Sequence, residues 1–354
     1  MFVANALALA VHASASADLA RVPAPAFLTP ADLAVVVNEA DPLSVAIGDY
    51  YRRKRGVPEA NMIHTRFDAT RASLWSGEFA RLRADVMART PQHVQAYALT
   101  WVQPYRVECM SITTAFAAGF DESFCSERCT STRWSPYYNS NSRRPYDDYG
   151  LRPSMSIAAV DLDRARELID RGVASDGSMS DGTAYLVETT DVARNVRAAG
   201  YRDAKMLAGR SMRVDIVRTD ALEQKQDVMF YFIGAAVVTK LATNRFLPGA
   251  IADHLTSLGG QLTGALQMSS LRWLEAGATG SYGTVTEPCN ILAKFPNPGM
   301  TIKRYAAGET LIEAYWKSVA MPGQGLFVGE PLAAPYRPRV ATAVRHASRI
   351  GDLN

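Results

Sequence analysis

Short apolar runs alternate with amphipathic stretches along most of this chain, and the alternation predicts successive β-strands and α-helices. The first unit shows the pattern well. Leu33 to Val37 is an apolar run typical of a buried strand, and Pro42 opens a helical repeat behind Asp41, a good N-cap. Gly56 supplies the helix stop, and Met62 to Phe67 is the next expected strand. A strand, a helix and a second strand in this order favour a parallel sheet.

The same alternation continues to Val328. Further strands are expected at Val94 to Val102, Ser156 to Val160, Ala184 to Thr189, Arg213 to Arg218, Val228 to Ile233, Ala250 to Leu255, Gly280 to Val285 and in GLFVGEPLAAP. Helices are expected at Gly77 to Arg89, Leu162 to Arg171 with a stop at Gly172, Ser270 to Glu275 and Leu311 to Val319. The run at Val228 is apolar enough for a central strand without an exposed face. We therefore expect a doubly wound, mainly parallel α/β sheet with right-handed crossovers.

One stretch interrupts the pattern. Residues 110–153 are rich in Ser, Thr, Asn, Arg and Tyr. Such a segment inside a compact domain is typically a binding loop, a lid or a disordered loop. We expect a single α/β domain over residues 18–340 with this loop-rich insert, followed by a tail at 341–354. Tyr137, Tyr138 and Tyr146 in the insert are candidate substrate-binding residues that, with nearby acidic residues, would line a ligand groove.

Composition narrows the class of partner. The chain has 354 residues, of which 48% are hydrophobic and 21% charged, as in ordinary globular proteins. Its formal net charge is +3, without a block of like charge. Nucleic-acid binding needs a concentrated basic face, so we expect no nucleic-acid partner.

The N-terminus points to export. Ala6 to Val11 is a short apolar run followed by small residues at the spacing that a signal peptidase accepts, so residues 1–17 are an expected signal peptide. The usual basic n-region is missing, and an Ala-rich tail is the alternative. No later segment is long and apolar enough for an integral membrane span. We expect a periplasmic or secreted protein.

The four cysteines are Cys109, Cys125, Cys129 and Cys289. In an oxidising compartment we expect Cys125 and Cys129 to be oxidised, either with each other or with Cys109. The alternative is a zinc site that uses these three thiols and a fourth ligand, but no second paired motif completes the ligand set. We expect neither a metal nor a cofactor.

The most informative stretch lies between Gly249 and Cys289, where His254 and Cys289 follow two apolar runs. Parallel strands end at one edge of a sheet, where binding sites usually form. An imidazole beside a thiol can withdraw its proton and create a thiolate nucleophile. Asp253 or Glu287 would orient the imidazole. These four residues are the candidate catalytic set.

The turn at Gly259 and Gly260 is a second candidate element, because its backbone N–H groups would lie close to a bound carbonyl, as an oxyanion site requires. A structural interpretation stands beside the catalytic one. Cys289 beside Pro288 is equally compatible with a small buried side chain, and His254 with a loop tie through its two ring nitrogens.

Two resemblances add context. The segments MSITTAFAAGF, PGAIADHLTSLGG, QMSSLRWLEAGATGSYGTVTEPCN, KFPNPG and GLFVGEPL resemble an uncharacterised family of exported bacterial proteins that occurs in genomes with the exosortase sorting system. The similarity runs from about Leu33 to Pro335. It implies export and no particular activity.

VVVNEADPLSVAIGDYYRRKRGVP, RPSMSIAAVDLDRARELIDRG, DVMFYFIGA, GATGSYGTV and VGEPL resemble, in this order, gingipain-like cysteine peptidases of the caspase-like fold. Those peptidases carry a His after the strand that corresponds to DVMFYFIGA and a Cys after the next strand. Here the first place holds Gly234-Ala235-Ala236 and the second Asp253-His254-Leu255. The resemblance implies the fold, and the catalytic pair is not carried over.

Two functions from different classes therefore remain. The first is an exported thiol hydrolase, a cysteine peptidase-like protein that acts on exported or surface proteins through a shifted pair, His254 then Cys289. The second is a catalytically silent binding protein of the same fold that uses the Tyr-rich insert. A free, reactive Cys289 favours the first function, and a Cys289 that is bridged or buried favours the second.

Overall fold

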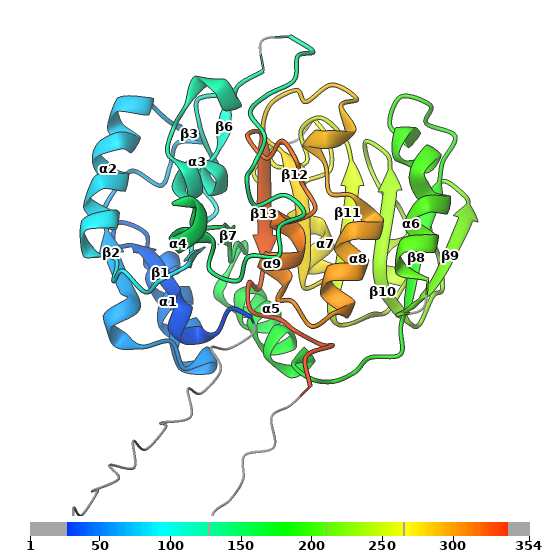
Figure 1. Cartoon of the computed structure of the whole chain (residues 1–354), viewed down its shortest axis with the longest axis horizontal. Helices are drawn as coiled ribbons and strands as arrows, with labels where there is room; N and C mark the ends of the chain where they lie inside the picture. Colours follow the sequence, from blue (N-terminus) through cyan, green and yellow to red (C-terminus); the bar gives the residue numbers. More distant parts are fainter. Residues whose placement is uncertain (1–26, 127, 210, 265, 339–354) are drawn as a thin grey trace, which may run out of the picture.

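The computed structural model describes residues 27–126, 128–209, 211–264 and 266–338. Its strands, in chain order, are β1 (Leu33–Asn38), β2 (Met62–Thr65), β3 (Ser73–Leu74), β4 (Ala96–Leu99), β5 (Arg106–Val107), β6 (Met110–Ser111), β7 (Ser154–Ser156), β8 (Thr183–Glu188), β9 (Arg213–Arg218), β10 (Val228–Gly234), β11 (Phe246–Leu255), β12 (Gly280–Thr284) and β13 (Gly325–Gly329). Ten of them form one sheet in the order β2-β1-β4-β7-β13-β12-β11-β10-β8-β9 (Figure 1). The short strands β3, β5 and β6 form a second sheet.

The large sheet contains two parallel blocks. β2, β1, β4 and β7 run parallel to one another and form the first block, and β12, β11, β10, β8 and β9 run parallel to one another and form the second block. β13 lies between the two blocks and pairs antiparallel with β12. The predicted doubly wound, mainly parallel α/β fold is thereby confirmed, with one antiparallel junction near the middle of the sheet.

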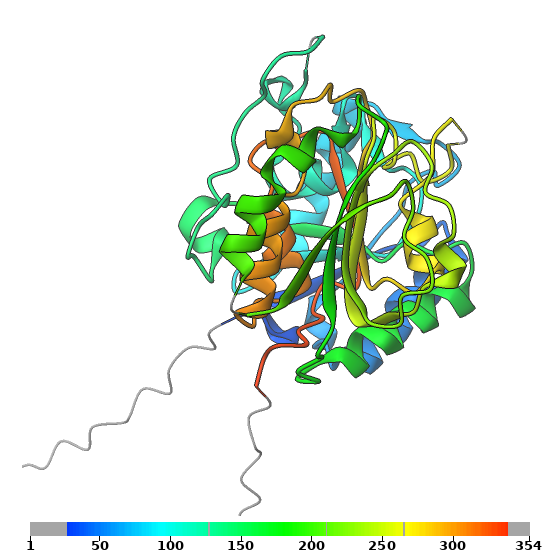
Figure 2. The ribbon, with the colours of Figure 1, turned by 90° about the vertical axis from the view of Figure 1, so that its right-hand side faces the viewer.

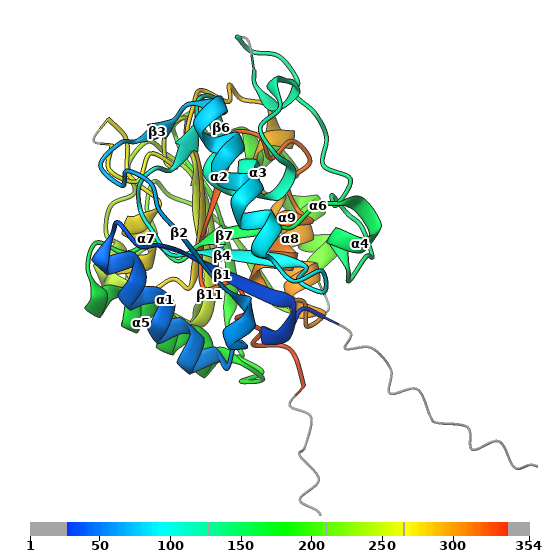
Figure 3. The same ribbon diagram turned by 90° about the vertical axis from the view of Figure 1, so that its left-hand side faces the viewer.

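Helices cover both faces of this sheet. They are α1 (Pro42–Arg55), α2 (Ser76–Arg89), α3 (Ile112–Ala118), α4 (Pro145–Tyr149), α5 (Leu162–Ser175), α6 (Tyr201–Ala208), α7 (Leu271–Glu275), α8 (Pro298–Ala306) and α9 (Leu311–Trp316). Figure 3 shows α1, α5 and α7 on one face, and α3, α6, α8 and α9 on the other. Figure 2 shows the strands of the second block lying between these two helical layers.

Local sequence signals explain most of these boundaries. Every residue of β1 is buried, as an apolar run between two layers requires. α1 begins behind Asp41, whose carboxylate accepts a hydrogen bond from the N–H of Leu43, and ends at Gly56 with φ of 69°. The predicted stop at Gly172 is wrong. α5 continues to Ser175, and Gly172 is where the helix packs against the side chain of Glu330.

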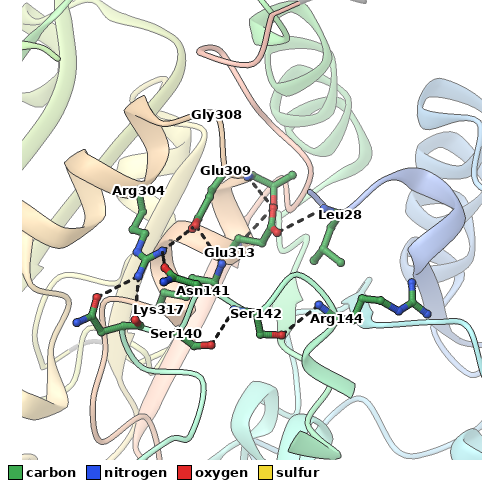
Figure 4. Close-up of polar contacts among 12 residues, drawn as sticks. Leu28, Ser140, Asn141, Ser142, Arg144, Arg304, Gly308, Glu309, Glu313 and Lys317 are labelled. Atoms are coloured by element: carbon green, nitrogen blue, oxygen red, sulfur yellow. Dashed lines mark hydrogen bonds and ion pairs between the residues drawn. The ribbon is translucent and has the colours of Figure 1, made fainter. Parts of the chain in front are cut away.

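The insert is a strap that is tied to the body of the protein. Disulfides join Cys109 to Cys125 and Cys129 to Cys289, with Cα–Cα distances of 5.6 and 5.5 Å. Farther along the strap, Arg304 of α8 donates hydrogen bonds to Asn139 and Asn141 (Figure 4). The Asn139 N–H in turn donates to the carbonyl of Lys317. These bonds hold the strap against the ends of α8 and α9.

None of the helices in the described ranges is long and apolar enough to cross a membrane.

Candidate binding groove at the carboxyl edge of the sheet

β10 and β11 are neighbouring parallel strands that end at the same edge of the sheet. Gly234 pairs with Leu255 at these ends, and Ile233 pairs with His254 one residue earlier. The loops that follow both strands therefore meet above this edge, where ligand sites of parallel sheets usually form.

His254 lies inside the protein and both of its ring nitrogens are engaged. Trp273 of α7 donates its indole N–H to Nδ1 at 2.9 Å, so Nδ1 carries no proton. Nε2 therefore holds the proton of the neutral ring and donates it to the carbonyl of Met268 at 3.0 Å. Burial lowers the pKa of His254 to about 4. The ring is neutral at physiological pH and has no free nitrogen to serve as a base.

Asp253 does not orient this imidazole, which corrects the expectation from sequence. Successive residues of a strand point to opposite faces of a sheet. His254 contacts α7, whereas Asp253 points to the face covered by α6 and α8. There its Oδ1 lies 2.6 Å from Nη1 of Arg197, and both side chains are buried. Burial raises the pKa of the Asp253 carboxyl, and the Arg197 guanidinium opposes that rise.

Cys289 is not a free thiol. Its sulfur is bonded to that of Cys129, so it has no proton to give to a base and no thiolate to attack a carbonyl. Glu287 is exposed, and its Oε1 accepts a hydrogen bond from the Cys289 N–H at 2.8 Å, which shapes the loop after β12. The described structure thus does not assemble the catalytic set expected from sequence.

All four cysteine sulfurs lie in these two disulfides. This decides between the predicted bridges and the alternative zinc site. Cys125 is bridged to Cys109, one of the two predicted partners. Cys129 instead joins Cys289, a pairing that was not predicted. The sulfurs are consumed by these bonds, so the zinc alternative is wrong for this structure.

Gly259 and Gly260 allow two chain segments to approach closely. A Cβ on Gly260 would lie 2.5 Å from the carbonyl oxygen of Gly283 in β12. The Gly260 N–H donates to the carbonyl of Thr284, and the Gly259 carbonyl accepts a hydrogen bond from the N–H of Ser270. Both glycines are buried. Their role here is packing, and the Gly260 N–H already has a partner, so it is not available to an oxyanion.

A polar network occupies the loops beyond β10 and β11. Thr256 donates its hydroxyl proton to Oε1 of Gln267 at 2.8 Å and accepts a hydrogen bond from Nε of Arg194 at 3.1 Å. Arg194 also pairs with Asp191. An amide oxygen is too weak a base to activate a hydroxyl nucleophile. The network therefore fixes the loops and offers no base to Thr256.

Beside this network lies a groove of about 590 Å³, within the usual range for ligand sites. Its walls come from loops that are far apart in the sequence, after β4, β7, β10 and β11, and from the start of α7. Gln103 in the loop after β4 donates a hydrogen bond to Thr263 in the loop after β11 at 2.9 Å, which joins two of these walls. The lining residues are Val102, Val160, Val237, Val238, Leu241, Leu262, Thr263, Gly264, Gln267, Met268, Ser269, Leu271 and Arg272.

Aliphatic side chains dominate this groove, and several of its residues are exposed to solvent. Val160 and Val237 on its rim are 55% and 58% exposed. Leu266, in the loop that forms one wall, is 84% exposed. A group of exposed apolar side chains around a hollow is typical of an interaction site.

The tyrosines expected to bind substrate do not contact this groove. Tyr137 is fully buried, which contradicts its predicted role. The Tyr138 ring packs against Trp134 at a centroid distance of 5.7 Å. The Tyr146 ring is covered by the Arg152 guanidinium at 3.2 Å. All three serve to pack the strap.

No family model matches this chain, and no curated protein matches it in sequence. Among solved structures, it is similar to the Arg-specific cysteine proteinase gingipain R, with a TM-score of 0.51 and 7% identity over 88% of this chain and 80% of that one. The complex of Porphyromonas gingivalis RgpB pro- and mature domains gives a TM-score of 0.45 and 8% identity, over 85% of this chain and 79% of that one.

The fold is therefore that of gingipain-like cysteine peptidases, as the sequence resemblance implied. At 7% identity this similarity concerns the fold and not the activity. The resemblance to the exosortase-associated family stays a sequence-based expectation.

Proposed function

We propose that this protein is a non-catalytic binding protein that holds an extended peptide segment in the groove at the carboxyl edge of β10 and β11. The groove itself is the observation that carries the proposal. It lies at the edge where parallel sheets bind their ligands, and aliphatic side chains line most of it.

The chemistry of the neighbouring residues favours binding over hydrolysis. A thiol peptidase needs a thiolate and a base within hydrogen-bonding reach. Here Cys289 is in a disulfide and His254 is neutral and saturated with hydrogen bonds. Reduction of the disulfide would free the thiol and leave His254 buried against Trp273, so reduction alone would not create a catalytic pair.

The Tyr-rich insert is less suited to bind a ligand than the groove is. Of its candidate tyrosines, Tyr137 is buried, Tyr138 packs against Trp134 and Tyr146 is covered by Arg152, and the backbone of the insert is bonded to the ends of α8 and α9. The groove offers open apolar surface instead. We therefore place the binding site in the groove.

We also propose that the protein is exported. The expected signal peptide lies outside the described residues, and the two disulfides support an oxidising compartment. Non-reducing peptide mapping of material from the periplasm or the medium should recover Cys109 with Cys125 and Cys129 with Cys289. Recovery of four free thiols would contradict both the pairing and export.

A random-peptide display library, panned on the folded protein, tests the binding proposal. We expect enrichment of peptides with aliphatic residues whose binding is lost in Val237→Asp, which places a charge on the groove rim. Val192→Asp is the matched control, because Val192 is 87% exposed and does not line the groove. The proposal fails if no peptide depends on Val237, or if recovered peptides are cleaved by the wild type.

A further inference from the structure

Gln267 offers a hydrogen-bond donor to a ligand in the groove. Its Oε1 accepts hydrogen bonds from the Thr256 hydroxyl at 2.8 Å and from the Leu258 N–H at 2.7 Å. A backbone N–H can only donate, so the amide oxygen must face Leu258 and Nε2 must point away from it. Among the described residues none accepts a hydrogen bond from Nε2. This amide NH2 group is therefore free to donate to an acceptor in the groove.

The charge of the groove is positive. Arg272 lies in the first turn of α7, lines the groove and has a side chain that is 58% exposed. Its partner is Glu275, one turn farther along the same short helix. Only the arginine end of this pair is well exposed, since the Glu275 side chain is 23% exposed, and the open side of the guanidinium can accept a ligand carboxylate while Glu275 stays in place. None of the described residues that line the groove is Asp or Glu.

The apolar surface continues beyond the groove. A smaller hollow adjoins it and shares Val160 and Leu271 with it. Ala158, Ala159, Leu168 and Leu274 complete the apolar part of this hollow, beside Arg164 and Glu275. With a volume of about 10 Å³ this hollow is too small to hold a side chain, so it extends the apolar surface as a shallow depression. A ligand that covers this surface as well as the groove needs apolar side chains at more than one position, as an extended peptide strand supplies on one of its faces.

From this arrangement we infer that the groove selects an extended segment with aliphatic anchors and an adjacent acidic group, either an acidic side chain or a terminal carboxylate. The inference rests on the proposed peptide-binding function and specifies the chemistry of the partner. One aliphatic side chain enters the groove and another packs over the smaller hollow, the carboxylate pairs with Arg272, and Gln267 donates to a backbone carbonyl. Basic segments are disfavoured because the groove is lined by Arg272 and by no carboxylate, and in the smaller hollow Arg164 accompanies the one carboxylate, Glu275.

Charge reversal at Arg272 tests the inference. Peptides recovered on the wild-type protein should be enriched in acidic residues next to an aliphatic residue. Arg272→Glu should weaken the binding of an acidic peptide about five- to tenfold and strengthen the binding of its Lys-substituted counterpart. The reason is that the charge at position 272 then repels the peptide carboxylate instead of attracting it. Arg166→Glu is the matched control, since Arg166 is a similarly exposed arginine paired with Asp163 on α5, outside the groove. Equal affinities for both peptides in wild type and Arg272→Glu would overturn the inference.

A second variant addresses the hydrogen bond. Gln267→Glu keeps an oxygen facing Thr256 and Leu258 and replaces the free amide NH2 group by a second oxygen. The loop structure is therefore preserved while the hydrogen-bond donor is lost. We expect several-fold weaker peptide binding with an unchanged melting temperature. Unchanged affinity would remove Gln267 from the site.

The outcomes of these experiments distinguish a failure of the acidic specificity from a failure of the proposed peptide-binding function. Peptides that depend on Val237 but show no charge preference would uphold binding in the groove and overturn the acidic specificity. Absence of Val237-dependent peptides would overturn both. Self-association that is lost in Val237→Asp would identify the occupant as a second copy of this chain and overturn the peptide proposal.

Discussion

The buried state of His254 makes the stability of this protein depend on pH in a defined way. In the folded chain the pKa of this ring is lowered to about 4, because burial disfavours the imidazolium, while an exposed His titrates near 6.5. As pH falls, the unfolded chain takes up this proton first. The stabilisation from the neutral ring is complete above about pH 6.5 and is lost progressively toward pH 4.

The magnitude follows from the distance between the two pKa values. A pH of about 5 lies roughly 1.5 units below the pKa of His254 in the unfolded chain and still above its pKa in the folded chain. Each unit corresponds to about 1.4 kcal/mol, so acidification from neutral pH to pH 5 costs about 2 kcal/mol through this residue alone.

To assign the pH-dependent loss of stability to His254, the wild type is compared with a variant that lacks its ionisable ring. His254→Gln keeps a neutral side chain of similar polarity and removes the ionisable group. Urea unfolding of wild type and variant near pH 7.5 and near pH 5 gives four free energies of unfolding. The variant is expected to be less stable at neutral pH, because it loses the fit to Trp273 and Met268, yet to lose about 2 kcal/mol less on acidification. Equal losses in both proteins would show that His254 titrates normally in the folded chain and would refute the buried, neutral assignment.

Three further outcomes follow from the same structure. Cys129→Ser with Cys289→Ser should destabilise the protein by about 3–5 kcal/mol in chemical unfolding, because that disulfide closes a loop with a sequence separation of 160 residues; an unchanged midpoint would count against the pairing. Arg197→Met should cost about 3–5 kcal/mol by leaving the Asp253 carboxylate buried alone, and Asp253→Leu in the same chain should restore part of that loss; additive losses would contradict the ion pair. Gly283→Ala should lower the melting temperature, since its Cβ would lie 2.3 Å from the backbone of the loop after β11, and normal stability would mean that this contact is looser.

The fold could be predicted where one physical signal dominates. The apolar run of β10 has no polar position to face solvent, so it had to be a central strand. α6 and α8 were missed, and so were α3 and α4, which lie in the segment expected to be a loop-rich insert. α8 nevertheless carries its own start signal, since Asn297 caps it and Pro298 occupies its first position. Reading that signal in KFPNPG would have predicted the helix.

The candidate site was less predictable, for two reasons. Strand alternation alone argues against Asp253 as a partner of His254, because neighbouring residues of a strand face opposite ways. The pairing of Cys289 with Cys129 had no local signal. It depends on where the insert lies against the loop after β12, and the two residues are 160 positions apart.

The groove could not be found in the sequence at all. Val102, Val160, Val237 and Leu262 belong to four separate loops, and each alone is an unremarkable aliphatic residue in a connecting segment. Only the sheet order, which places the loops after β4 and β7 beside those after β10 and β11, brings them together.

Hydrogen exchange of the full-length protein, with and without the tightest displayed peptide, tests the central claim most directly. We expect protection of residues 235–241 and 262–272, little change in residues 110–153, and recovery of the peptide uncleaved by mass spectrometry. Protection confined to residues 110–153 would move the site to the insert, and recovery of cleaved peptide would make the protein an enzyme; either result would contradict binding without catalysis in the groove.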